Sequence, residues 1–363
     1  MHSAKNTEEH MSMNIRIVGA GLMGTSLGLA LRNQGHALEM VDRDHAHQEL
    51  AMDLVGGISI EEPDLVVIAT PVELVLPVLI EQYQRNPDAR FIDISGLKSN
   101  LLLEVGRIPG LNSRFLGTHP MAGREIAGPQ GARADLFEGR AWIITPSSQT
   151  EPSFLAAIRT LVEGAGATAF ELDPEIHDER IALISHLPQV VSSLLGAELA
   201  DHAPEELNLA GAGLRDTTRL AASSPDLWSE LLVMNSHEVL PLLESIKGSI
   251  DKLIERLDEG DREGVRQIIA RGNEGRALIP GKHGGTGRSY DLLPIVIDDK
   301  PGQLAKIFAE CEAISVNIED LTIEHSPGQE TGLITLALSP SDAQRLHLHM
   351  VAQGWLAHKP RSS

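Results

Sequence analysis

The stretch that decides the fold of the first half of the chain is Ile15-Arg16-Ile17-Val18-Gly19-Ala20-Gly21-Leu22-Met23-Gly24. Four strand-forming residues lead into a glycine-spaced turn, and the helical pattern TSLGLALRNQG follows directly. An acidic residue, Asp42, ends the next predicted strand, eighteen residues after Gly24. A strand, a G-x-G-x-x-G turn, a helix and then an acidic residue indicate a Rossmann-type dinucleotide-binding domain.

The glycines of this turn have separate roles in such a domain. Gly19 permits the tight turn, Gly21 lets the backbone approach a pyrophosphate, and Gly24 lets the helix pack closely on the strand. The helix N-terminus adds free N–H groups and the positive end of its dipole. A glycine-rich turn without a ligand is the alternative, and the surrounding pattern disfavours it.

The second strand carries the signal for cofactor choice. A carboxylate at Asp42 accepts hydrogen bonds from ribose hydroxyls and repels a 2′-phosphate, so we predict NAD rather than NADP. Arg43 complicates this prediction, because it could stack on adenine or pair with a phosphate. The predicted cofactor-binding residues are Gly19, Ala20, Gly21, Leu22, Met23, Gly24, Asp42, Arg43, Thr70 and Pro71.

Short apolar runs alternate with helical patterns over residues 14–173, which predicts an α/β domain with a buried parallel sheet. Ligands of such sheets lie beyond the carboxyl ends of the strands. Three segments fall there: Thr70-Pro71, Ser95 to Lys98, and Thr118 to Gly123. A histidine in this position, His119, is a candidate acid or base because its charge changes near neutral pH.

Composition excludes several classes of function. The 363 residues have a formal net charge of -21, which opposes nucleic acids or anionic membranes as partners. One cysteine, Cys311, excludes an internal disulfide framework, and no metal site is expected. A reducing cytoplasm is the expected compartment. No apolar run approaches the roughly 18 residues of a membrane span.

The pattern of apolar residues changes at residue 174, and residues 174–279 show helical patterns only. We predict helices over residues 177–200, kinked at Pro188, 226–257, interrupted at Pro241, and 261–279. Apolar residues on more than one face favour a helical dimerisation domain, and a monomeric bundle is the alternative. Taken alone, His186 is typical of a core histidine. The glycines before Arg215 and Arg219 indicate an anion site or a helix cap with solvated arginines.

The last part of the chain is separated by a linker over residues 280–289, which contains four glycines and a proline. Residues 290–363 then show a strand-helix-strand-strand-helix pattern with a short last strand. This order is typical of a small ferredoxin-like α+β domain.

Four motifs in order resemble the prephenate and arogenate dehydrogenases of tyrosine biosynthesis, in addition to the glycine turn. They are THPMAGRE (118–125), ISHLPQ (184–189), GLRDTTRLA (213–221) and SSPDLW (223–228). The resemblance covers about residues 14–279. It implies NAD(P)-dependent oxidative decarboxylation of prephenate to 4-hydroxyphenylpyruvate, or of arogenate to tyrosine.

The resemblance also implies roles for individual side chains. His119 accepts the proton of the ring hydroxyl, His186 contacts substrate or nicotinamide, and Arg219 binds a substrate carboxylate, while Arg215 and Trp228 belong to the substrate pocket. The family commonly has a serine where this chain has Gly96, which leaves Ser95, Ser99 or a water to assist His119.

Residues 290–363, with DKPGQL at 299–304, resemble an ACT domain, a type that typically binds amino acids and regulates the attached enzyme. The resemblance implies regulation, for which we expect Pro301, Gly302 and Asn317 to bind an effector, with tyrosine as the hypothesis. An oligomerisation module is the alternative.

Two other functions stay open on the sequence alone. One is a different two-domain dehydrogenase for hydroxy or imino acids, which would not need His119, His186 and Arg219 together. The other is a catalytically silent sensor of NAD and amino acids, for which Gly96 is the only support.

Overall fold

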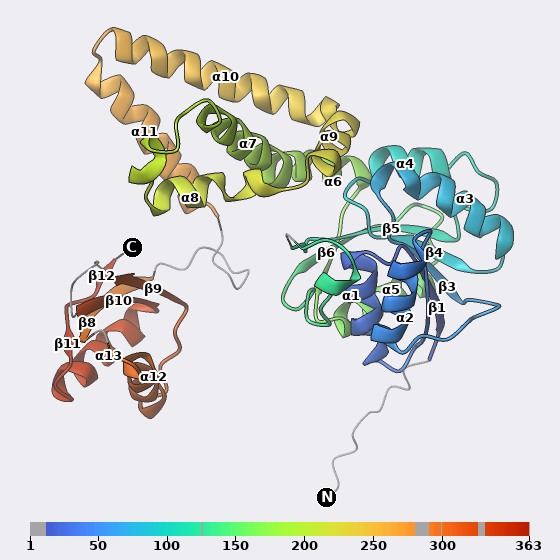
Figure 1. Cartoon of the computed structure of the whole chain (residues 1–363), viewed down its shortest axis with the longest axis horizontal. Coiled ribbons are helices and arrows are strands. Elements are labelled where there is room, and N and C mark those ends of the chain that lie inside the picture. Colours follow the sequence, from blue (N-terminus) through green and yellow to red (C-terminus); the bar gives the residue numbers. More distant parts are fainter. Residues whose placement is uncertain (1–11, 125, 280–289, 299, 326–330, 363) are drawn as a thin grey trace, which may run out of the picture. The chain divides into compact units, whose positions relative to one another are not determined.

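The computed structural model describes residues 12–124, 126–279, 290–298, 300–325 and 331–362 (Figure 1). It divides into two compact units, one ending at Asp251 and the other beginning at Lys252. The linker predicted at 280–289 lies outside the described residues, as does Asp299 of the DKPGQL motif. Each unit is described separately.

The first unit is built on a seven-stranded sheet in the order β2-β1-β3-β4-β5-β6-β7. Strands β1 to β5 are parallel, as predicted, whereas β6 runs antiparallel to β5. The reversal arises because the chain returns from β5 to β6 through a loop instead of a crossover helix. The strands are β1 (Asn14–Val18), β2 (Ala37–Val41), β3 (Leu65–Ile68), β4 (Arg90–Asp93), β5 (Phe115–Pro120), β6 (Ala141–Thr145) and β7 (Thr168–Glu171).

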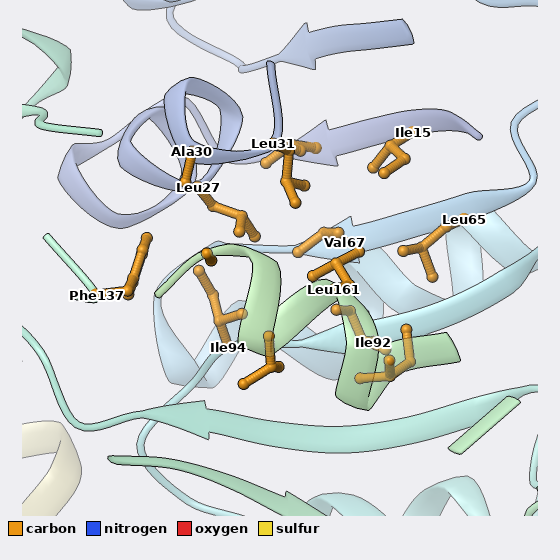
Figure 2. Packing of buried hydrophobic residues seen from close by; sticks show 14 of the residues in the cluster. Ile15, Leu27, Ala30, Leu31, Leu65, Val67, Ile92, Ile94, Phe137 and Leu161 are labelled. Carbon is orange, nitrogen blue, oxygen red and sulfur yellow. The ribbon is translucent and has the colours of Figure 1, made fainter. Parts of the chain in front are cut away.

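Helices cover both faces of this sheet. On one face lie α1 (Leu22–Arg32), α2 (His45–Val55) and α5 (Pro152–Gly164), and on the other α3 (Val75–Arg85) and α4 (Ser99–Val105). Leu27 and Leu31 of α1 and Leu161 of α5 are buried against strand residues (Figure 2). Aliphatic side chains buried on both faces hold the strand ends, and therefore the loops of the site, in fixed positions.

The rest of the first unit is helical, and within residues 174–279 the structure contains no strand, as predicted. The elements are α6 (Pro174–Ile181), a π-helical turn (Ala182–His186), α7 (Leu187–Leu199), α8 (Ala212–Thr218), a 3₁₀ turn η5 (Arg219–Ala222), α9 (Pro225–Met234), α10 (Ser236–Asp258), whose last residues belong to the second unit, and, within the second unit, α11 (Arg262–Ala277). The chain distorts just before Pro188, because proline lacks the N–H that an α-helix requires.

The interruption predicted at Pro241 is wrong. Pro241 lies inside α10, and the break between α9 and α10 falls earlier, at Asn235. Pro241 is the sixth residue of α10, and the helix continues through it although proline supplies no N–H to the helical hydrogen bonds. The buried Asn235 instead directs its amide into the site.

Residues 174–199 form one continuous helical stretch that is long and apolar enough for a membrane span, with a mean hydropathy of 1.2. A helix was predicted over residues 177–200, but the prediction that no apolar run approaches the length of a membrane span is wrong for this helix. Its residues Asp178, His186 and Gln189 are buried, and Asp178 accepts backbone hydrogen bonds from the start of α4. Those contacts are typical of a helix within a folded domain.

The second unit contains a separate small sheet in the order β11-β8-β10-β9, with antiparallel pairing and β12 beside β8. Its element order is strand-helix-strand-strand-helix-strand, which is the ferredoxin-like pattern. The elements are β8 (Asp291–Asp298), α12 (Gln303–Ala313), β9 (Asp320–His325), β10 (Thr331–Leu338), α13 (Pro340–Ala352), β11 (Leu356–Ala357) and β12 (Arg361–Ser362).

Candidate active site

The glycine turn between β1 and α1 has the geometry of a phosphate-binding turn. Gly19 has a φ of +111°, and a Cβ there would lie 2.4 Å from the carbonyl oxygen of Ala69. A Cβ at Gly24 would lie 2.0 Å from the carbonyl oxygen of Gly19, so only glycine permits this packing. By contrast, nothing lies within 4 Å of a Cβ at Gly21. The backbone of Gly21 at the start of α1 is therefore open to a ligand.

Polar groups around the turn fit a dinucleotide. Asp42 follows β2 and accepts hydrogen bonds from the backbone N–H of Ala20 (2.6 Å) and Asp44 (2.9 Å). A carboxylate has about four acceptor positions, so Asp42 retains two for ribose hydroxyls. The Oγ1 of Thr70, just beyond β3, is buried without a hydrogen-bond partner. Arg43 and Pro71 are exposed beside these residues, and Leu22 and Met23 are partly buried.

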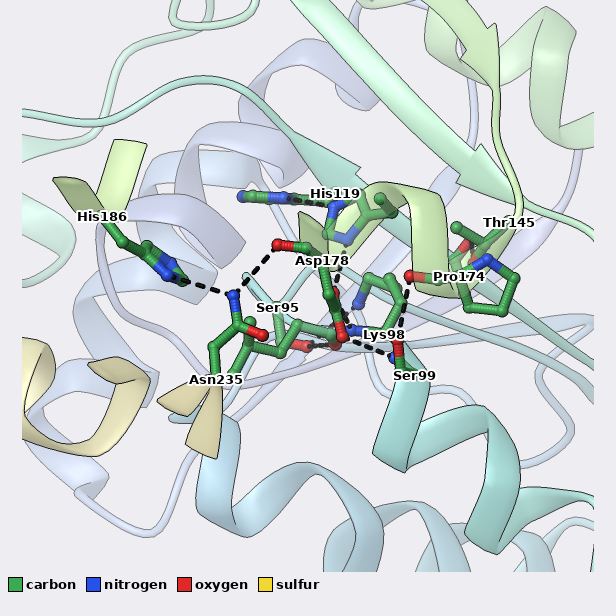
Figure 3. A network of polar contacts seen from close by, with 12 residues as sticks. Ser95, Lys98, Ser99, His119, Thr145, Pro174, Asp178, His186 and Asn235 are labelled. Carbon is green, nitrogen blue, oxygen red and sulfur yellow. Dashed lines mark hydrogen bonds and ion pairs between the residues drawn. The ribbon is translucent and has the colours of Figure 1, made fainter. Parts of the chain in front are cut away.

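A chain of three titratable side chains begins at His119, in β5. His119 Nδ1 lies 2.9 Å from His177 Nε2, and His177 Nδ1 lies 2.7 Å from Asp178 Oδ1 (Figure 3). Asp178 also accepts backbone hydrogen bonds from Lys98 (2.9 Å) and Ser99 (2.8 Å). His177 and Asp178 come from α6, so this chain joins the sheet to the helical part of the same unit.

A buried ion pair lies beneath the histidines. Lys98 Nζ, which is fully buried, pairs with Asp93 at the end of β4 and contacts Ser95 Oγ at 3.0 Å. Burial lowers the pKa of Lys98, while Asp93 opposes that shift. The hydroxyl of Ser95 donates to Asp93, and that of Ser99 donates to the carbonyl of Pro174 at 2.9 Å. Neither serine assists His119 through these contacts, and His177 is the partner of its Nδ1.

His186 approaches the same region from the π-helical turn. Its Nδ1 lies 3.2 Å from Asn235 Nδ2, which also donates to the carbonyl of Asp178 at 3.0 Å. The ring of Trp228 stands edge-on to His186, with centroids 5.8 Å apart. His186 is thus buried and is connected to Asp178 through Asn235. His119 is connected to Asp178 through His177, so both predicted histidines lie near this carboxylate.

Burial sets the charge of both predicted histidines. Burial and the nearby His177 and Lys98 hold the pKa of His119 well below its ordinary value. Burial lowers the pKa of His186 to about 4. Both rings are therefore neutral at pH 7, and a neutral imidazole has a nitrogen lone pair that can accept a proton.

The two predicted arginines are exposed. Arg215 lies on α8 and Arg219 at the start of η5, a segment that α7 holds in place. Gln189 donates to the carbonyl of Leu220 at 2.9 Å, and Ser192 accepts from the N–H of Ala221 at 3.1 Å. Both α7 side chains are buried and were missed in the sequence, although Gln189 ends the ISHLPQ motif.

The predicted effector residues lie in the second unit. Pro301 and Gly302 are exposed before α12, and Gly302 has a φ of +87°, as a strand-to-helix turn requires. Asn317 was expected on a strand but lies in the loop before β9, where its amide donates to Glu319 at 3.2 Å. Positive φ at Ser315 shows that the chain turns here before it can pair with β10.

Two family models match the chain. Residues 27–171 match the nucleotide-binding domain of prephenate dehydrogenase, and residues 173–271 match its dimerization domain. "Probable prephenate dehydrogenase NovF" of Streptomyces niveus is 30% identical, over 94% of this chain and 98% of its own length. The chain belongs to the prephenate dehydrogenase family. Neither family model reaches the small sheet of the second unit.

Solved structures support the same assignment. Prephenate dehydrogenase from A. aeolicus, solved with hydroxyphenyl propionate and NAD+, is 27% identical, with a TM-score of 0.68 over 75% of this chain and all of its own. Synechocystis arogenate dehydrogenase is 29% identical, with a TM-score of 0.61 over 73% of this chain and 99% of its own. The family and the glycine turn together make this chain an NAD-dependent oxidoreductase.

Proposed function

We propose that the protein catalyses oxidative decarboxylation of prephenate to 4-hydroxyphenylpyruvate in tyrosine biosynthesis. The observation that carries this proposal is His119, a neutral imidazole at the carboxyl end of the sheet, on the side where the glycine turn opens. A base in that position takes the hydroxyl proton while the same carbon loses hydride. Loss of CO₂ then makes the ring aromatic.

Each residue of the candidate site has a separate role in this reaction. His119 Nε2 accepts the hydroxyl proton, and Arg219 holds a substrate carboxylate with a planar, permanently charged guanidinium. His186 and Trp228 form the wall of the pocket beside Asn235, and Arg215 belongs to the same anion-binding segment. The glycine turn, Asp42 and Thr70 hold NAD, which supplies the hydride acceptor.

The direct test is to incubate the protein with prephenate and NAD+ and follow the absorbance of reduced nicotinamide. Arogenate in place of prephenate distinguishes the second candidate, which the Synechocystis relative favours. Hydroxy and imino acids test the remaining dehydrogenase class. Absence of turnover with every substrate would favour a silent sensor and overturn the proposed activity.

Cofactor preference follows from Asp42, which would face the 2′-phosphate of NADP as a like charge. Such a contact costs several kcal/mol, so we expect kcat/KM to fall by more than about tenfold when NADP+ replaces NAD+. Asp42→Asn should reduce the difference in kcat/KM between NAD+ and NADP+. The control Asp53→Asn, at an exposed position of α2, should leave that difference unchanged. Equal activity of the wild type with both cofactors would assign Arg43 as a phosphate ligand.

Regulation is proposed for the second unit, as an ACT domain that binds tyrosine near Pro301, Gly302 and Asn317. An effector shifts activity only if it binds one arrangement of the catalytic domains better than another, and substrate and tyrosine should then weaken each other's binding.

A chain truncated near residue 280 should keep dehydrogenase activity and lose tyrosine inhibition. We would measure inhibition of both forms by tyrosine under identical conditions. Equal inhibition of the truncated enzyme would place tyrosine in the active site as a product analogue.

We also propose that the protein is a cytoplasmic homodimer formed by its helical domain. Exposed apolar side chains on its helices support this, including Ile184, Leu194 and Val233, which are 60%, 61% and 71% exposed. A second copy would bury this surface, which a monomer would leave in water.

A further inference from the structure

His177 and Asp178 have no part in the activity described so far, although they are the residues that His119 reaches. Both are buried, and they follow one another at the start of α6. The contacts form a line from His119 Nδ1 to His177 Nε2 at 2.9 Å, and from His177 Nδ1 to Asp178 Oδ1 at 2.7 Å. Such a line fixes where each proton resides.

The direction of the protons follows from Asp178. Its oxygens accept hydrogen bonds from the backbone N–H groups of Lys98 and Ser99 at the start of α4, which favours the ionised carboxylate. An ionised carboxylate only accepts, so His177 donates from Nδ1. The Nε2 of a neutral His177 then carries a lone pair and accepts the Nδ1–H of His119. The lone pair of His119 is left on Nε2.

The free nitrogen faces Gly96. A Cβ at Gly96 would lie 3.9 Å from His119 Nε2, and glycine has no side chain to fill this position. Leu231 closes the other side, 3.2 Å from the same Cβ. Because residue 96 is a glycine, no side chain occupies this position beside His119 Nε2, and a substrate hydroxyl could approach the lone pair there.

We propose that His177 and Asp178 are positioning residues that hold His119 in the tautomer with Nε2 free and stabilise the cation it becomes. This inference rests on the proposed function. In the step, the substrate O–H bond breaks and its proton bonds to His119 Nε2. His119 keeps its Nδ1–H, which is still donated to His177, and the proton counts of His177 and Asp178 do not change. The proton later leaves from Nε2 to water.

The charges around His119 make such support necessary. His177 and Asp178 face it from α6, Lys98 from the loop after β4, and His186 from the π-helical turn. Lys98 opposes a positive charge on His119, although Asp93 pairs with it. Asp178 is the acidic group whose field favours the His119 cation, so its removal should make protonation of His119 harder.

The first test is the tautomer of His119, read from its ring ¹⁵N chemical shifts in the full-length protein without substrate. We expect protonated Nδ1 and unprotonated Nε2 in the wild type and in His177→Gln, whose amide oxygen can still accept. His177→Leu should lose this preference. The exposed pair His202 and Glu206, 2.8 Å apart, gives the control variant His202→Leu, which should change nothing at His119.

The second test is turnover. Because misplacement of a reacting group costs on the order of 10²-fold, His177→Leu should lower kcat by about that factor with KM for prephenate nearly unchanged. His177→Gln should restore part of the loss. In Asp178→Asn, the acid limb of the kcat profile should move to lower pH, which a purely structural role would not produce.

Failure of the positioning role and failure of the proposed function give different results. A wild type with the proton on His119 Nε2, or a His177→Leu enzyme with normal kcat, would overturn the positioning role. If the protein does not oxidise prephenate at all, the proposed function fails, while the ¹⁵N shifts of wild type, His177→Gln and His177→Leu still decide whether His177 sets the tautomer.

Discussion

Replacing His119 by Asn should lower kcat with prephenate by about 10²–10⁴-fold, the range expected when a general base is lost. The amide N–H of asparagine can still donate to His177 from near the position of Nδ1, but asparagine cannot take up a proton. NAD+ affinity should change little. Among the described residues, the structure shows no hydrogen bond between His119 and either the glycine turn or Asp42. Steady-state kinetics and NAD+ titration measure the two quantities separately.

The pH dependence of kcat is a second test of the role of His119 as a base. The base must be deprotonated, and burial, with a smaller effect of Lys98, holds the pKa of His119 well below its ordinary value. Activity should therefore persist below pH 6.5 and fall only as the pH drops through the lowered pKa. His202→Asn, at an exposed bend after α7, is the control. A His119→Asn enzyme with near-normal kcat would remove the mechanism.

Much of the fold could be predicted because it depends on local patterns. The alternation of apolar runs and helical patterns over residues 14–173 predicted the α/β domain, and Gly19 and Gly24 are positions that only glycine can occupy. The antiparallel β6 could not be predicted, because strand direction depends on the path of the loop before it. The predicted break at Pro241 is wrong because packing keeps α10 helical through the proline, and the helix begins at Ser236 instead.

The site was predictable only in part, for a physical reason. His119 and His186 lie in recognisable motifs, but what they contact depends on the packing of α6 against the start of α4. His177 and Asp178 are adjacent titratable residues near the beginning of an apolar helical stretch, which was the one available signal. Their burial and the buried Lys98–Asp93 pair are tertiary facts that no short pattern contains.

Arg219→Ala should raise KM for prephenate by about ten- to a hundredfold, because a charge-assisted pair with a carboxylate is worth roughly 1.5–3 kcal/mol. The 3₁₀ turn η5 that carries Arg219 is held on α7 by the buried Gln189 and Ser192, so the backbone there should survive the change. Arg219→Lys should restore only part of the affinity, because an ammonium lacks the planar fork of a guanidinium.

Arg215→Ala is the matched comparison, because Arg215 is an exposed arginine on the neighbouring helix α8. If KM is unchanged in Arg219→Ala and rises in Arg215→Ala, the carboxylate ligand is Arg215. If Gln189→Leu raises KM while leaving NAD+ affinity intact, the support of η5 by α7 is itself part of substrate binding. An unchanged KM in both arginine variants would exclude this segment as the carboxylate site, and the search would move to cations nearer His119.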